Sequence, residues 1–157
     1  MRTLILYGSK YGYTKECAHL LRDELGETDI VDLGRPHSVS LDAYDTVLIG
    51  SPVYIGEIDK NVIRFCNVHL ATLTEKRIGL FVCAGEPDKA IEQLEVGFPR
   101  ELVHVACAKG YFGYRIDLTR LSLLDRILLT GVGKLRNEED MKRGAIRDFA
   151  KNFLQEG

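Results

Sequence analysis

The stretch LILYGSKYGYTKECA, residues 4–18, runs from an apolar strand-like segment through a small polar loop into a helical pattern. A continuous apolar run is typical of a strand buried on both faces of a parallel sheet. The loop, residues 9–14, carries hydroxyls at Ser9 and Thr14 and a glycine at Gly12. Such groups at the N-terminus of a helix favour a bound phosphate. The alternative is that Thr14 only caps the helix.

The same alternation continues along the chain and predicts an α/β fold. The predicted strands are 3–7, 29–33, 46–50, 77–84 and 102–108, and the predicted helices are 14–25, 60–70, 88–98 and 138–154. Strands that alternate with helices indicate a parallel sheet covered on both faces, and the length indicates one domain over 1–157. Only the segment 109–137 departs from the alternation, and its centre, 118–129, predicts an additional amphipathic helix with arginines on its polar side.

Composition excludes several classes of protein. At 45% hydrophobic and 28% charged residues the chain is an ordinary globular sequence, and it has no apolar run long enough for a transmembrane helix and no signal-peptide pattern. The four cysteines form no CxxC pair, which favours reduced thiols and a cytoplasmic location, and the four histidines lack the spacing of metal ligands, so no metal site is predicted.

Charge is slightly uneven along the chain. Residues 109–157 carry 10 Lys and Arg against 7 Asp and Glu, although the whole chain has a net charge of −2. This excess is too small to predict nucleic-acid binding. An anionic small molecule, the inner surface of an anionic membrane and an ordinary solvated surface all remain open as explanations.

Two further loops follow predicted strands at the same edge of the sheet. GSPVYIG, residues 50–56, closes the 46–50 strand, and Ala84-Gly85 closes the 77–84 strand. Together with the first loop they predict a phosphate pocket beside a planar, partly apolar slot. The patterns GxxxxGK[ST] and GxGxxG are absent, as is the acidic cluster of a receiver domain, which excludes the commonest nucleotide loops and that class of regulator.

These loops resemble those of the flavodoxin family, which binds FMN, and the resemblance extends over nearly the whole chain. Ser9, Gly12 and Thr14 match the phosphate-loop pattern [ST]-x-[ST]-G-x-T, whereas Tyr11 and Tyr13 depart from it. The resemblance implies a flavodoxin-like doubly wound five-stranded parallel sheet of order 2-1-3-4-5, with helices on both faces. It implies that the phosphate is enclosed by Ser9, Lys10, Tyr11, Gly12, Tyr13 and Thr14, and that the isoalloxazine is lined by Ser51, Pro52, Val53, Tyr54, Ile55 and Gly56, with Ala84 and Gly85 on its other side.

The chain departs from standard electron-carrier flavodoxins in three features. In these features it resembles one branch of the family, the menaquinone-dependent protoporphyrinogen oxidases of bacterial haem synthesis. The chain is not strongly acidic, its third loop has no aromatic residue, and GYFGYRIDLTRLSLLDRILL (110–129) is basic and hydrophobic. This resemblance implies electron flow from protoporphyrinogen IX through FMN to a quinone. The residues implied to contact this substrate are Lys109, Tyr111, Tyr114, Arg115 and Arg120, the cations binding its propionates.

Two other functions remain open at this point. The chain could be a small electron-transfer flavodoxin that docks to redox partner proteins, or a flavin-free interaction module of the same fold. In the two hypotheses that include FMN, no catalytic side chain is expected, because the cofactor carries the chemistry. The 118–129 helix would contact a membrane surface, its own domain or a second copy of the chain.

Overall fold

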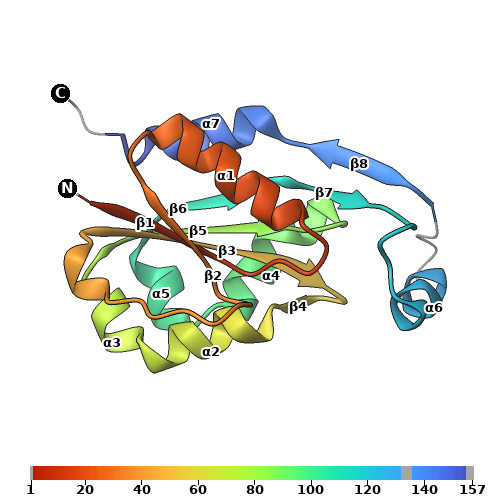
Figure 1. Cartoon of the computed structure of the whole chain (residues 1–157), viewed down its shortest axis with the longest axis horizontal. Helices are drawn as coiled ribbons and strands as arrows, with labels where there is room; N and C mark the ends of the chain where they lie inside the picture. The colour runs from red at the N-terminus through yellow and green to blue at the C-terminus, as the bar shows by residue number, and fades with distance from the viewer. Residues whose placement is uncertain (1, 132–135, 155–157) are drawn as a thin grey trace.

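The computed structural model describes residues 2–131 and 136–154, and a parallel sheet forms the centre of the molecule (Figure 1). Its strands are β1 (Thr3–Tyr7), β2 (Asp29–Asp32), β3 (Thr46–Tyr54), β5 (Arg77–Cys83) and β6 (Ala106–Tyr111). Over the described residues their order is β2-β1-β3-β5-β6, which confirms the predicted order 2-1-3-4-5. A short strand, β4 (Glu57–Ile58), folds back antiparallel onto the end of β3.

Helices cover both faces of this sheet, as predicted. One face carries α1 (Tyr13–Leu25) and α7 (Arg143–Lys151), and the other carries α2 (Lys60–Val68), α3 (Leu70–Leu73), α4 (Ala90–Gly97) and α5 (Arg100–Val105). Short 3₁₀ turns, η1 (Leu41–Ala43) and η2 (Pro87–Lys89), precede β3 and α4.

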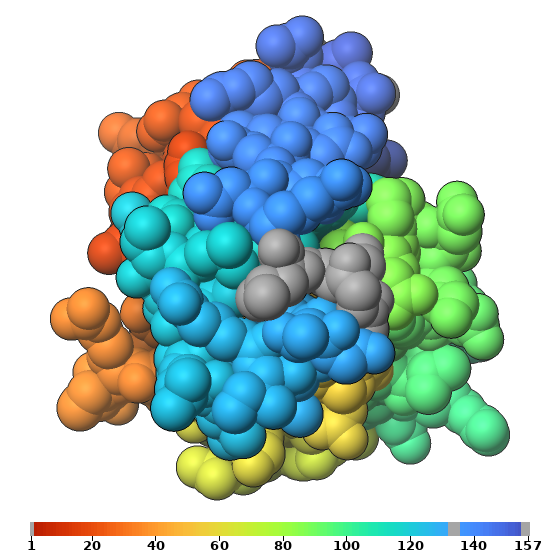
Figure 2. All heavy atoms as spheres, turned by 90° about the vertical axis from the view of Figure 1, so that its right-hand side faces the viewer, coloured from red at the N-terminus to blue at the C-terminus, as the bar shows by residue number. Residues whose placement is uncertain are grey.

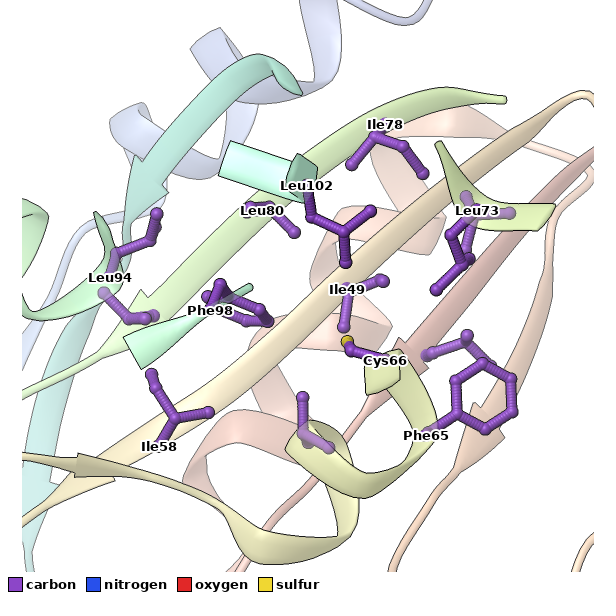
Figure 3. Packing of buried hydrophobic residues seen from close by; sticks show 14 of the residues in the cluster. Ile49, Ile58, Phe65, Cys66, Leu73, Ile78, Leu80, Leu94, Phe98 and Leu102 are labelled. Carbon is purple, nitrogen blue, oxygen red and sulfur yellow. The ribbon is translucent and has the colours of Figure 1, made fainter. Parts of the chain in front are cut away.

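The strands contribute side chains to two hydrophobic cores, one on each face of the sheet, because successive side chains of a strand point to opposite faces. In β1, Leu4 and Leu6 join the core under α2 to α5, whereas Ile5 joins the core under α1 and α7. Figure 3 shows the first of these cores, where Leu94, Phe98 and other apolar side chains of the helical layer meet the sheet. Burial on both faces explains why the strands appear in the sequence as continuous apolar runs.

Two predicted elements near the C-terminal part are wrong in their bounds. The predicted strand 102–108 is helical up to Val105, and β6 then continues to Tyr111. The predicted helix 138–154 begins with a strand, β8 (Glu138–Met141), which pairs antiparallel with β7 (Gly113–Ile116) and precedes α7. Opposite charges face each other across the β7–β8 pair, Arg115 against Glu139. A partner distant in sequence therefore decides that residues 138–141 form a strand.

The additional helix of the 109–137 segment exists, but it begins five residues later than predicted. It is α6 (Leu123–Gly131), and it lies beyond the carboxyl ends of the sheet strands (Figure 1). Within the described residues, no helix has both the length and the apolar character needed to span a bilayer.

Candidate functional site

The three predicted loops surround one cavity of about 450 Å³ at the carboxyl ends of β1, β3 and β5. This volume lies in the range of small-molecule sites, roughly 300–1,000 Å³. The predicted residues that line it are Ser9, Lys10, Tyr11, Tyr13, Thr14, Pro52, Val53, Tyr54, Ile55, Gly56, Ala84, Gly85, Tyr114 and Arg115. Gly12, Ser51, Lys109, Tyr111 and Arg120 are not among the lining residues, and their places are described below.

The first loop both caps α1 and contributes to the cavity wall. Gly12 is the N-cap with φ of 90°, a left-handed conformation that favours glycine. The Ser9 Oγ accepts hydrogen bonds from the Gly12 N–H at 3.1 Å and the Lys15 N–H at 3.4 Å. The capping hydroxyl is therefore that of Ser9, and the alternative that Thr14 is the N-cap is wrong. Thr14 lies in the first turn of α1, where a helix attracts an anion.

The two tyrosines of this loop point to different surroundings. The Tyr13 hydroxyl donates to the Phe112 carbonyl at 2.6 Å, so Tyr13 ties α1 to the segment between β6 and β7. The pKa of Tyr13 is raised, mainly because the side chain is buried, and its hydroxyl therefore stays protonated. The Tyr11 hydroxyl, in contrast, is buried on the cavity wall.

The second loop is a two-residue hairpin between β3 and β4. Tyr54 pairs with Glu57, and the residues between them, Ile55 and Gly56, have φ of 49° and 76°. Positive φ at both positions is the signature of a type I′ turn, which prefers Asn-Gly and strains a β-branched residue such as Ile55. Ser51 is fully buried behind this loop, where its Oγ accepts from the Asp59 N–H at 2.9 Å and donates to the Pro52 carbonyl at 2.7 Å.

The third loop is held from behind by β6 and β7. The Ala84 N–H donates to the Gly113 carbonyl at 3.0 Å, and the Tyr111 hydroxyl donates to the Ala84 carbonyl at 2.9 Å. Tyr111 therefore supports the loop from behind. Cys83, at the end of β5, also lines the cavity, and burial raises the pKa of its thiol, which stays protonated.

Several lining residues were not predicted from the sequence. Glu86 precedes η2, Lys89 ends it and Gln93 lies in α4, whereas Ile116, Leu121 and Leu129 come from the segment that follows β6. The side of α4 that faces the cavity carries polar residues without a recognisable pattern, so no signal in the sequence identifies them.

Two buried polar atoms on the cavity wall lack a hydrogen-bond partner among the described residues: the Tyr11 hydroxyl and the Gln93 Oε1. Such atoms usually cost folding free energy unless a ligand or water satisfies them. FMN fits this arrangement, because it combines a dianionic phosphate, a polyhydroxyl chain with donors and acceptors, and a planar ring. The phosphate suits the start of α1, and the ring suits the apolar walls of the second and third loops.

The cations predicted to bind propionates are each paired with a carboxylate of this chain. Arg115 lies 2.7 Å from Glu16 and 2.9 Å from Glu139. The remaining contacts of this set are Lys109 with Glu95 at 3.2 Å, and Arg120 with Asp117 at 3.5 Å and with the Tyr11 carbonyl at 3.1 Å. Tyr114 donates to Glu138, and this hydrogen bond raises the pKa of Tyr114 to about 12. Because these cations are already paired with carboxylates, they offer little uncompensated positive charge to a porphyrinogen propionate.

Helix α6 lies across the cavity and carries a buried carboxylate at its inner side. Asp125 is only 2% exposed, and Tyr54 donates a hydrogen bond to its Oδ1. The Lys10 ammonium lies 2.8 Å from Oδ2 and 4.2 Å from the centre of the Tyr54 ring. Leu121, just before α6, and Leu129 line the cavity. Figure 2 views the molecule from this end, where the atoms of α6 lie below the centre of the view.

A model of the flavodoxin domain matches residues 4–142. The chain belongs to the flavodoxin family. It is 30% identical to an uncharacterized protein of Methanocaldococcus jannaschii over 99% of both chains, and 28% identical to a flavodoxin of Haemophilus influenzae over 77% of this chain and 75% of that one. The solved flavodoxin structure from Streptococcus pneumoniae superimposes with a TM-score of 0.59 at 17% identity, covering 97% of each chain.

As a flavodoxin-family protein, the chain departs from the expected site at its third loop. The segment from Cys83 to Lys89 has no aromatic residue to cover the cavity. The aliphatic side chains of Ile116, Leu121 and Leu129 form part of the wall instead, and α6 supplies the last of them. The amphipathic pattern of 118–129 had indicated a helix, but only the structure shows that its acidic residue faces inward.

Proposed function

We propose that this chain binds FMN in the cavity between its three loops and transfers electrons with it. The convergence of the first, second and third loops on one cavity at the start of α1 supports this proposal most strongly. FMN, when bound, supplies the electron acceptance and donation, and the protein contributes binding and positioning. Membership of the flavodoxin family is consistent with FMN-based electron transfer.

The residues divide the ligand between them in this proposal. Ser9, Gly12 and Thr14 shape the phosphate end with the first turn of α1, and Tyr54 with Gly85 bounds the ring. The Tyr11 hydroxyl and the Gln93 Oε1, which have no hydrogen-bond partner in the part of the chain that the structure describes, meet the polar groups of the cofactor. This arrangement keeps the cofactor oriented and leaves its reactivity to its own chemistry.

For the electron partner, we propose a redox protein. Each cation assigned to porphyrinogen binding is paired with a carboxylate, so the site offers little for two propionates. Oxidation of protoporphyrinogen with a quinone remains a second candidate, favoured by the apolar wall from Leu121 and Leu129. A peripheral membrane contact stays a prediction, favoured by the outward side chains of Leu123 and Leu124, which are 76% and 65% exposed.

A flavin-retention experiment tests the proposal. Purified protein is incubated with FMN and desalted, and its visible spectrum is recorded before and after anaerobic reduction and after addition of oxidised cytochrome c. We expect retained flavin that is reduced and then passes electrons to the cytochrome. Absence of retained flavin contradicts the proposal. Turnover with protoporphyrinogen and a menaquinone analogue, measured on the same sample, would instead favour the second candidate.

A further inference from the structure

Asp125 is a buried carboxylate that joins α6 to two loops of the cavity. Its Oδ1 accepts the hydroxyl of Tyr54 from the second loop, and its Oδ2 pairs with the ammonium of Lys10 from the first loop. Lys10 also lies over the Tyr54 ring, so the three side chains form one compact cluster. We call this cluster, Lys10, Tyr54 and Asp125, the latch.

Asp125 is buried in a helix whose exposed side chains are mostly apolar, although Arg126 and Thr130 are also exposed. Leu123, Leu124 and Ile127 are 76%, 65% and 61% exposed, whereas the one carboxylate of α6 is buried. Burial of a charge is costly unless it is paired and hydrogen bonded. Tyr54 donates to Oδ1, and Oδ2 has the ion pair with Lys10 at 2.8 Å but no hydrogen bond among the described residues. These two contacts offset the burial of Asp125 and connect α6 to the loops of the cavity.

Both partners of Asp125 belong to the loops that we assign to the cofactor. Lys10 is next to Ser9 in the first loop, and Tyr54 lies at the hairpin of the second loop. Leu129 of the same helix reaches the cavity wall, so α6 stays over the cavity while the latch is closed. A ligand that enters from this end must therefore displace α6.

We propose that α6 is a lid over the flavin site and that Asp125 is the positioning residue that keeps it closed. The inference rests on the proposed FMN function. Opening of the lid breaks the contacts of Asp125 with Lys10 and Tyr54, and these contacts form again when the lid closes. The latch therefore slows entry and exit of FMN together and changes the rates more than the equilibrium affinity.

The experiment compares wild type with Asp125→Asn, which keeps the size of the side chain and removes its charge. Asp148→Asn is the matched control, because Asp148 forms an exposed ion pair with Lys151 on α7, on the face opposite α2. Stopped-flow quenching of FMN fluorescence gives the association and dissociation rates, and hydrogen exchange of the FMN-free proteins reports opening of residues 123–131. Tyr54→Phe, which keeps the ring, is a second latch variant in case Asp125→Asn does not fold.

We expect Asp125→Asn to raise both FMN rates by about tenfold, the size expected for loss of a hydrogen bond or ion pair to a charged group. Exchange of α6 should accelerate in the same variant, and Asp148→Asn should behave as wild type. Unchanged rates and unchanged exchange in both latch variants would overturn the lid. If wild type binds no FMN, the proposed function fails, while the exchange of α6 in the FMN-free proteins still decides whether Asp125 holds the helix.

Discussion

The two hydroxyls of the first loop, those of Ser9 and Thr14, have different surroundings. Ser9 caps α1 through the N–H groups of Gly12 and Lys15. Thr14 is 2% exposed and lies on the cavity wall in the first turn of the helix. The capping function is therefore already provided by Ser9. The Thr14 side chain hydrogen bonds with Cys83, and we propose that its hydroxyl also contacts a bound phosphate.

Replacement of Thr14 by alanine tests this division. We expect Thr14→Ala to weaken FMN binding by about 1–2 kcal/mol, because a hydrogen bond to a charged group is lost. Fluorescence titration measures the affinity. Thr74→Ala is the control, since that hydroxyl donates to the Ala71 carbonyl at the end of α3, away from the cavity. Equal affinities for wild type and Thr14→Ala would remove Thr14 from the phosphate site.

Ile55 carries backbone strain at the hairpin of the second loop. Its φ of 49° is unfavourable for a β-branched residue, and Asn-Gly is the preferred pair in such a turn. We expect Ile55→Asn to raise the free energy of unfolding by about 1 kcal/mol, the lower end of the cost of such strain. Urea denaturation provides the measurement. Val68→Asn, an exposed apolar position in α2, serves as control, and a destabilised Ile55→Asn protein would contradict the strain.

At the scale of elements, the parallel sheet was predictable and the antiparallel pair of β7 and β8 was not. Each parallel strand is buried on both faces and appears as an apolar run, so local sequence is sufficient to identify it. In contrast, β8 has the sequence EEDM and no strand pattern, and it forms because β7 lies beside it. The run at 102–108 is ambiguous because a short apolar stretch fits a buried helix as well as a strand.

Arg115 connects the β7–β8 pair to α1 through its ion pairs with Glu139 and Glu16. Its side chain is 22% exposed, so the pairs are only partly screened by solvent. We expect Arg115→Gln to lower the free energy of unfolding by about 1–2 kcal/mol in urea denaturation. Arg147→Gln is the control, because its pair with Glu24 is long, at 3.8 Å, and exposed. Equal losses in the two variants would show that Arg115 does not anchor the β7–β8 pair.

Tyr111 makes the join between β6 and the third loop sensitive to alkaline pH. Burial raises the pKa of Tyr111 to about 12, above the value near 10 of an unfolded tyrosine. Its stabilisation is thus complete below pH 10 and is lost as the pH rises toward 12. We expect wild type to be more stable than Tyr111→Phe at pH 9, and this difference to shrink by pH 11.5 in urea denaturation. A difference that stays constant with pH would contradict the raised pKa.

At the scale of the whole molecule, the sequence predicted the loops that line the cavity but not the contribution of α6 to its wall. The three loops follow apolar strands whose carboxyl ends must meet at one edge of the sheet, so most lining residues could be named in advance. The inward side of α6 could not, because Asp125 stands among leucines and a periodic pattern does not say which side is buried. The ion pairs of Arg115 and Arg120 likewise depend on distant carboxylates.

The most direct test of FMN binding at the start of α1 is the affinity of the purified protein for FMN compared with riboflavin, measured by fluorescence titration under identical conditions. The two ligands differ only in the phosphate that we assign to the start of α1. We expect saturable binding of FMN, with riboflavin weaker by at least about tenfold, as expected for lost hydrogen bonds to a charged group. Equal binding of the two flavins, or no binding of either, would contradict it.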